Sequence, residues 1–327
     1  MAELEAQLFS TKDFSPRIQD ANFPCVCLND SGTVVVFYQS RGKVYYVIGN
    51  TDLQHEHDTS KSSLNSKHRL DWGDSQLYGD GCNVKAAIND QNEVVLVRSR
   101  TRRRECMYRV GNVDVSAKCI NWWSNEMCLC SGVNPTVALV GNTVLFVYEA
   151  QYGFCRCYYE VSKIENKQIW ATRNIKARLI PELNGCKEVS IAINQSGRVV
   201  ITCRNAVGSG LYCAVGSLID ATVRDVTLNG TPYVSGYYSC ISVLNDGIVV
   251  SAHEDEAFGN SSLKLLCGRV SDSVINWEEE QELDHGYKPS LAVSNKQQMI
   301  VVHVDKSGVQ THGELKYKFG TLSSRLH

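Results

Sequence analysis

The chain has 327 residues, of which 43 % are apolar and 21 % charged, an ordinary globular mixture that excludes a wholly disordered protein. Its 33 basic and 35 acidic side chains give a net charge of −2, which argues against a nucleic-acid-binding protein that depends on bulk positive charge. No run of 18 apolar residues occurs, so the sequence predicts no membrane span.

A unit of 50 to 60 residues repeats six times along the chain. Each copy opens with a Gly-x-x-Pro-like segment, then has a short apolar strand, a turn and a Val-rich strand. In chain order these segments are ANFPCVCLNDSGTVVVFYQS, GCNVKAAINDQNEVVLVRSR, GVNPTVALVGNTVLFVYEA, GCKEVSIAINQSGRVVITCRN, GYYSCISVLNDGIVVSAHED and GYKPSLAVSNKQQMIVVHVDKS. The Pro position of the repeat falls at Pro24, Val84, Pro135, Val189, Ser239 and Pro289, in steps of 60, 51, 54, 50 and 50 residues.

A third strand follows in each copy, and a fourth follows in all but the last copy, which supplies three strands and stops near Leu322. The third strand ends in a small residue, which is Gly49, Gly111, Ser162, Gly216, Gly268 or Gly320, in steps of 62, 51, 54, 52 and 52 residues. The fourth strand carries a tryptophan in four copies, at Trp72, Trp122, Trp170 and Trp277. Two independent landmarks with matching steps identify a true internal repeat.

The repeat predicts an all-β fold. Segments of five to seven residues rich in Val, Ile and Tyr, separated by Asn-Asp-x-Gly-type turns, are typical of strands in hairpins. One four-stranded unit cannot bury both of its faces, whereas units packed radially can, as in a β-propeller. We therefore predict one domain over 1–327, a six-bladed β-propeller of four-stranded antiparallel blades. The blades are expected at about 20–78, 79–130, 131–183, 184–234, 235–284 and 285–322, the last completed by the N-terminal strand 2–10.

The 14 cysteines do not form a spaced framework. Cys25/Cys27, Cys128/Cys130 and Cys155/Cys157 are C-x-C pairs, whose thiols point the same way on a strand, as packing side chains do. Zinc sites are typically built from C-x-x-C pairs or added histidines. We expect mostly free, buried thiols and, since the start MAELEAQLFSTKDF lacks the regions of a signal peptide, a cytoplasmic protein, with secretion left open.

The pattern G-x-x-P-S-V-A-h-N-x-x-G-x-V-V-x-V-H-x-S, then L-x-Y-x-V-G and I-x-W, resembles lectin-like β-propeller repeats. It is similar to those of bacterial fucose-binding propeller lectins and of uncharacterised microbial and invertebrate propellers, and covers nearly the whole chain. This chain has six copies where those lectins have seven, and copies two, four and five lack the proline. The resemblance implies carbohydrate binding in shallow sites at or between blades, without catalysis. The sialidase Asp-box and the WD signature are absent.

Candidate binding residues lie on the rim where strand two ends. The position that is His in the family pattern holds Tyr38, Arg98, Tyr148, Cys203, His253 and His303. Aromatic faces stack on sugars, and Arg, Glu and His form hydrogen bonds with hydroxyl groups. The predicted ligand-binding set is Tyr38, Arg98, Tyr148, Glu149, Arg204, Tyr238, His253, Glu254, Tyr287 and His303.

Two further motifs carry charge or possible metal ligands. The hairpin RSRTRRRE in copy two holds five arginines, from Arg98 to Arg104, which could grip an acidic partner at Arg100–Arg104 or protect an exposed edge. His55, Glu56 and His57 lie in a polar loop without a third defined ligand, so we expect them to be solvated. Nucleophile and phosphate-loop motifs are absent. We expect neither a metal nor a cofactor, and the sequence carries no indication of an oligomeric state.

The leading hypothesis is a non-enzymatic recognition protein that binds a glycan or another small polar ligand. The first alternative is an enzyme, either a hydrolase or a cofactor-free oxidase or oxygenase, with one site at the channel mouth. Its catalytic candidates are His253, His303, Arg98, Tyr148, Glu149 and Glu254. The second alternative is a protein-interaction scaffold that uses the arginine hairpin.

Overall fold

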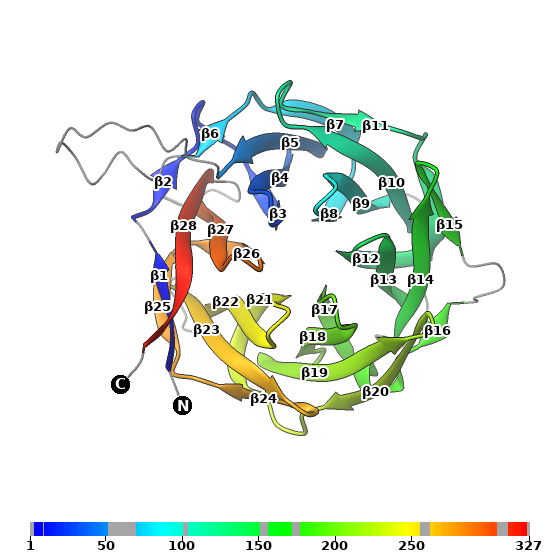
Figure 1. The fold of residues 1–327 in the computed structure, drawn as a ribbon, viewed down its shortest axis with the longest axis vertical. Helices are drawn as coiled ribbons and strands as arrows, with labels where there is room; N and C mark the ends of the chain where they lie inside the picture. The colour runs from blue at the N-terminus through cyan, green and yellow to red at the C-terminus, as the bar shows by residue number, and fades with distance from the viewer. Residues whose placement is uncertain are drawn as a thin grey trace.

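The structure is a computed structural model that describes residues 3–8, 10–51, 70–100, 104–150, 156–171, 177–255, 262–305 and 313–325. The predicted all-β fold is confirmed, since the one helical element among these residues is a single 3-10 turn, η1 (Pro181–Leu183). Figure 1 shows the sheets arranged around a central axis, with the strands of each repeat stepping outward, as in a β-propeller. The described residues include no helix with the length and apolarity of a membrane span.

The strands follow the repeat. The first copy supplies β3 (Asn22–Leu28), β4 (Thr33–Ser40), β5 (Lys43–Asn50), β6 (Asp71–Trp72) and β7 (Gln76–Asp80). The second supplies β8 (Cys82–Ile88), β9 (Glu93–Arg100), β10 (Glu105–Asp114) and β11 (Cys119–Trp122). The third contains β12 (Met127–Val140), β13 (Thr143–Ala150), β14 (Cys157–Glu165), β15 (Gln168–Ala171) and β16 (Arg178–Leu179).

The second half of the chain repeats this order. The fourth copy has β17 (Cys186–Ile193), β18 (Arg198–Asn205), β19 (Gly210–Ile219) and β20 (Thr222–Leu228). The fifth has β21 (Val234–Val243), β22 (Ile248–Asp255), β23 (Ser262–Ser271), β24 (Val274–Trp277) and β25 (Gln281–His285). The sixth has β26 (Tyr287–Val293), β27 (Gln298–Asp305) and β28 (Glu314–Arg325), joined by β1 (Glu3–Leu8) and β2 (Lys12–Asp13) from the N-terminus.

All strand pairs are antiparallel, and two long strands connect neighbouring repeats. The first residues of β12 pair with β10 of the second repeat, and the rest of β12 pairs with β13 of the third. β21 connects the fourth repeat to the fifth in the same way. The hydrogen bonding therefore gives four sheets, two of five strands and two of nine.

The core lies between neighbouring repeats. On β4, Val34 and Val36 pack toward the sixth repeat, and Val35 and Phe37 pack toward the second. A strand buried on both faces is apolar at successive positions, which explains runs such as VVVF. The described residues form six buried apolar clusters, each between two neighbouring repeats, and one of them joins the sixth repeat to the first.

The N-terminal segment belongs to the sheet of the sixth repeat. β1 pairs with β28 over six residues, from Glu3 opposite Arg325 to Leu8 opposite Gly320. β2 pairs with the same strand at Lys12 and Asp13. The turns on one side of the molecule add a further contact between the sixth and first repeats, because the N–H of Asn295 donates to Oδ1 of Asp30 at 2.6 Å.

Candidate functional site

Each of the six innermost strands contains a β-bulge, at the same position of the repeat. The register shifts lie between Asn22 and Cys25, Cys82 and Lys85, Val133 and Thr136, Lys187 and Ser190, Tyr237 and Cys240, and Tyr287 and Ser290. Every bulge holds one non-glycine residue with φ between 46° and 56°; these six residues, the bulge ring, are Phe23, Asn83, Asn134, Glu188, Tyr238 and Lys288. All directly precede the Pro position of the repeat.

The backbone of the bulge ring is strained. The left-handed region costs an L-residue about 1–2 kcal/mol. Bulges are common beside active sites, where they re-aim a side chain, and strained residues concentrate at functional sites. All six repeats keep the same strained conformation, although the side chain at this position differs between them. The conformation therefore has a role that does not depend on one type of side chain.

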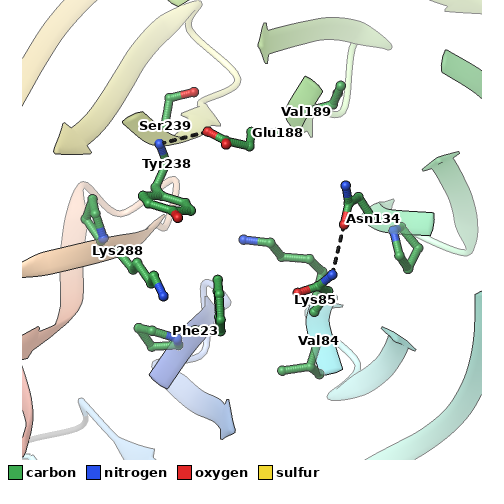
Figure 2. A pocket seen from close by; sticks show the side chains of 13 residues that line it. Phe23, Val84, Lys85, Asn134, Glu188, Val189, Tyr238, Ser239 and Lys288 are labelled. Carbon is green, nitrogen blue, oxygen red and sulfur yellow. Dashed lines mark hydrogen bonds between the residues drawn. The ribbon is translucent and has the colours of Figure 1, made fainter. Parts of the chain in front are cut away.

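The bulge ring surrounds one end of the central channel. A cavity of about 230 Å³ opens there, lined by the bulge ring, by the six residues at the Pro position and by Lys85. Figure 2 shows Lys85 extending toward the middle of this mouth pocket, with Phe23, Tyr238 and Lys288 on one side, Asn134 across from them, and Glu188 next to Tyr238.

An aromatic and cationic cluster forms one wall of the mouth pocket. The rings of Phe23 and Tyr238 meet edge to face, with centroids 6.3 Å apart. Nζ of Lys288 lies 3.5 Å from the centroid of Phe23 and 5.4 Å from that of Tyr238, within cation–π range, and it donates to Oδ1 of Asn22 at 2.9 Å. This wall offers both a flat apolar surface and a positive charge.

Next to Tyr238 lies Glu188, a carboxylate that is already bound by other residues. Arg204 donates two hydrogen bonds to Glu188, from Nε to Oε2 at 2.9 Å and from Nη2 to Oε1 at 2.6 Å. These bonds to Glu188 raise the pKa of Arg204. The N–H of Tyr238 also donates to Oε2 of Glu188, at 3.4 Å (Figure 2). Beside this pair, Nδ2 of Asn83 donates to Oδ1 of Asn134 at 2.8 Å.

Two carboxylates stand behind the bulge ring and hold its backbone. Oε1 of Glu149 accepts the N–H of Glu188 at 3.2 Å, and Oε2 of Glu254 accepts the N–H of Lys288 at 3.2 Å. Each bond runs from the end of strand two in one repeat to the bulge of the next repeat. Burial raises the pKa of Glu149. These bonds orient the strained residues of the pocket.

The structure distributes the predicted site residues over three places. Of the ten, Tyr238 alone lines the mouth pocket within the described chain. Arg204, Glu149 and Glu254 contact the bulge ring as described above. The remaining six, which do not line the pocket, are Tyr38, Arg98, Tyr148, His253, Tyr287 and His303.

Four of those six residues lie beside the outer strands or the segments next to them. Tyr38 forms a hydrogen bond with Ser75, and Nε of Arg98 donates to Oε1 of Glu126 at 2.6 Å. Nε2 of His253 lies 3.2 Å from Oε1 of Glu280, and Nε2 of His303 lies 3.5 Å from Oδ2 of Asp284. Burial lowers the pKa of each imidazole to about 4, so both histidines are neutral at pH 7.

The two remaining residues lie near the ends of their strands. The ring of Tyr148 on β13 stacks on that of Tyr158, with centroids 6.2 Å apart. Burial raises the pKa of Tyr148. Tyr287 begins β26, one residue before Lys288 of the bulge ring.

Sequence reasoning missed five of the six bulge-ring residues and Lys85. The signal was present, because the residue before the Pro position differs in kind between copies of an otherwise similar segment: Phe, Asn, Asn, Glu, Tyr and Lys. A buried structural position would keep one type of side chain in all repeats. Divergence at this position is what a single asymmetric site requires.

A second cavity, of about 440 Å³, lies at the other end of the channel. Its polar groups are engaged in bonds between repeats: Nδ2 of Asn29 donates to the carbonyl of Asn89, Nδ2 of Asn89 to that of Gly141, and Nδ2 of Asn194 to that of Leu244. This end therefore holds neighbouring repeats together, and the mouth pocket is the better candidate for a ligand.

The structure adds no support for the two other candidate sites from the sequence, the arginine hairpin and the His55–His57 segment. Arg100 lies 3.5 Å from Glu105 and 3.9 Å from Glu126, so part of the arginine hairpin is neutralised, while Arg102 and Arg103 lie outside the described residues. His55, Glu56 and His57 are also outside them. Within the described chain, no group of three or more His, Cys, Asp or Glu side chains is placed to hold a metal ion.

Comparison with known proteins supports the fold alone. No family model matches the chain, and no curated protein matches it in sequence. Among solved structures, a protein of unknown function from Dyadobacter fermentans aligns at 12 % identity with a TM-score of 0.58, over 93 % of this chain and 95 % of its own. A Hadza microbial sialidase aligns at 9 % identity and TM-score 0.62, over 92 % and 66 %. Aleuria aurantia lectin, in complex with Fucα1-6GlcNAc, aligns at 10 % identity and TM-score 0.59, over 93 % and 97 %.

Proposed function

We propose that this protein is a glycan-binding protein that holds one sugar unit per chain in the mouth pocket. The observation that carries the proposal is the bulge ring: six strained residues line one cavity with five different kinds of side chain. A lectin with equal sites on every repeat would need the same residues in each copy. Here the copies differ, so the ring forms a single site.

The side chains of the pocket suit a carbohydrate. The rings of Phe23 and Tyr238 can stack on the C–H faces of a sugar, and the amides of Asn83 and Asn134 can exchange hydrogen bonds with hydroxyl groups. The solved structures with this fold include a lectin in complex with a fucosylated disaccharide and a sialidase. That structural similarity is consistent with glycan recognition.

The proposal includes the architecture that the site needs. The six repeats are the blades of one six-bladed propeller, a single domain over 1–327 that β1 closes by joining the sixth blade. The buried cluster between the sixth and first repeats and the bond from Asn295 to Asp30 support this closure. The 13 cysteines in the described chain are all free thiols, which favours a reducing compartment such as the cytoplasm.

Hydrolysis is less well supported by the pocket. Most glycosidases use a pair of carboxyl groups, and sialidases use a tyrosine nucleophile. Glu188 is the one carboxylate among the described lining residues, and Arg204 binds both of its oxygens. Burial raises the pKa of Tyr238, the opposite of what a nucleophilic phenolate requires.

A glycan array followed by calorimetric titration of the best hit tests the proposal. We expect one binding site per chain, and at least a tenfold loss of affinity in Phe23→Ala and in Tyr238→Ala, because each removes a stacking surface. Trp170→Ala is the control, since Trp170 is an exposed aromatic on the outer strand β15. Several sites per chain, or no binding to any glycan, would contradict the proposal.

A further inference from the structure

The mouth pocket contains more positive than negative charge that a ligand could use. Lys85 lies on β8 of the second repeat and Lys288 on β26 of the sixth, so the two lysines flank Phe23 of the first repeat. Figure 2 shows the side chain of Lys85 reaching into the pocket and that of Lys288 turned toward Phe23. Both ammonium groups therefore belong to the lining of the cavity.

The carboxylate that lines the pocket, Glu188, already has donors in the described chain. Glu188 is bound by both Nε and Nη2 of Arg204 and by the N–H of Tyr238. Glu149 and Glu254 accept backbone N–H groups from the bulge ring. Glu188, the one carboxylate among the described lining residues, is therefore neutralised by Arg204, whereas Lys85 and Lys288 both line the cavity.

We infer that the ligand is an anionic sugar unit, bearing a carboxylate or a sulfate, whose charge is bound by Lys85 and Lys288. Placement next to Lys288 brings the sugar ring against Phe23 and Tyr238, so one ligand can use the charge and the aromatic surface together. The cavity of about 230 Å³ is below the range of about 300–1,000 Å³ of drug-sized pockets, which suits one sugar unit. This inference rests on the proposed glycan-binding function.

Pairs of glycans that differ only in charge test the inference. We would titrate the protein with sialyllactose and lactose, with a glucuronate-terminated and a glucose-terminated disaccharide, and with a sulfated and an unsulfated galactoside. At least one acidic member should bind tenfold or more tightly than its neutral partner. Its affinity should fall as salt is raised, because screening weakens an exposed charge contact.

Variants connect the charge preference to the pocket. Lys85→Met keeps the length of the side chain and should lower the affinity for the acidic ligand at least tenfold more than it lowers the affinity for its neutral partner. Lys118→Met is the control, since Lys118 pairs with Asp71 on outer strands. A melting curve for each variant verifies folding.

The outcomes separate the two proposals. If neutral and acidic partners bind equally, or if Lys85→Met keeps the full preference, the inference is overturned while glycan binding stands. If no member of any pair binds and the wider array is also blank, the proposed function itself fails.

Discussion

The imidazole of His303 lies across Gly286, and a Cβ placed on that glycine would be 2.5 Å from Cδ2 of the histidine. The same relation recurs between Gly236 and His253, at 2.7 Å, and between Gly81 and Cδ of Arg98, at 2.6 Å. In these three repeats, the glycine of the Gly-x-x-Pro segment therefore contacts the divergent residue near the end of strand two, although the two positions are separated in sequence. The glycine leaves room for the side chain that crosses it.

Gly236→Ala tests this contact, because Gly236, unlike Gly81 and Gly286, does not have a positive φ and its backbone can accept an alanine. The new methyl would meet the carbonyl oxygen of Glu254 at 2.5 Å and Cδ2 of His253 at 2.7 Å, and relieving such overpacking costs about 1–3 kcal/mol. We expect that loss in urea unfolding. Gly230→Ala, which meets no atom within 4 Å, is the control and should be near neutral. Equal stability of the two variants would refute the steric role of Gly236.

The pair formed by Arg98 and Glu126 predicts a large stability effect without an effect on binding. Two guanidinium nitrogens of Arg98 bond to the carboxylate, the arginine side chain is 8 % exposed and that of the glutamate 16 %. Breaking one partner of a buried pair costs about 3–5 kcal/mol. We expect a loss of this order for Glu126→Ala in urea unfolding.

The apolar double replacement Arg98→Met with Glu126→Leu is the matched comparison. It removes both charges, so it should recover much of the loss seen in Glu126→Ala. Glycan affinity should be unchanged in the double variant, because neither side chain lines the mouth pocket. A loss of affinity there would assign Arg98 to the binding site, as the sequence suggested.

The sequence predicted the repeat and the all-β fold because both depend on patterns that recur six times. Strands buried on both faces, such as β4, are apolar at successive positions and can be recognised directly. The N-terminal strand was inferred because the last copy contained only three strands. Each of these features follows from backbone hydrogen bonding and burial, which constrain residue type.

The mouth pocket could not be predicted in the same way. Phe23 and Lys288 share a backbone conformation, yet nothing in their residue types indicates a left-handed φ, which asparagine or glycine would have signalled. Lys85 is separated from Lys288 by most of the chain, and only the arrangement of the repeats brings both to one cavity. The predicted histidines do occupy equivalent places, at the contacts with Gly236 and Gly286.

Deletion of residues 1–12 tests the role of β1. The deletion removes the six residues of β1 that pair with β28, and Lys12 of β2, and it exposes the buried cluster that Ala6 and Leu8 cover. We expect a lower melting temperature and a greater tendency to aggregate, because an unpaired strand edge recruits other chains. Deletion of residues 326–327 is the control. A melting curve that does not change after loss of β1 would refute closure by the N-terminal strand.

Acid should destabilise the protein through His253 and His303. Both imidazoles have a folded-state pKa of about 4, below the ordinary 6.5, because they are buried. The unfolded chain therefore takes up protons first as the pH falls, so stability from these groups is complete above pH 6.5 and is lost progressively down to pH 4. Each histidine accounts for about 3 kcal/mol over that window.

Neighbouring charges titrate too, so the effect must be measured as a difference. Asp255, Lys264 and Glu280 face His253, while Asp284, Lys316 and Lys318 face His303. The variant carrying His253→Gln and His303→Gln keeps these groups but cannot be protonated at the two positions. We expect its unfolding free energy to fall less than that of the native protein between pH 6.5 and pH 4, measured by urea unfolding. Parallel curves for the two proteins would show that the buried imidazoles do not set the acid limit.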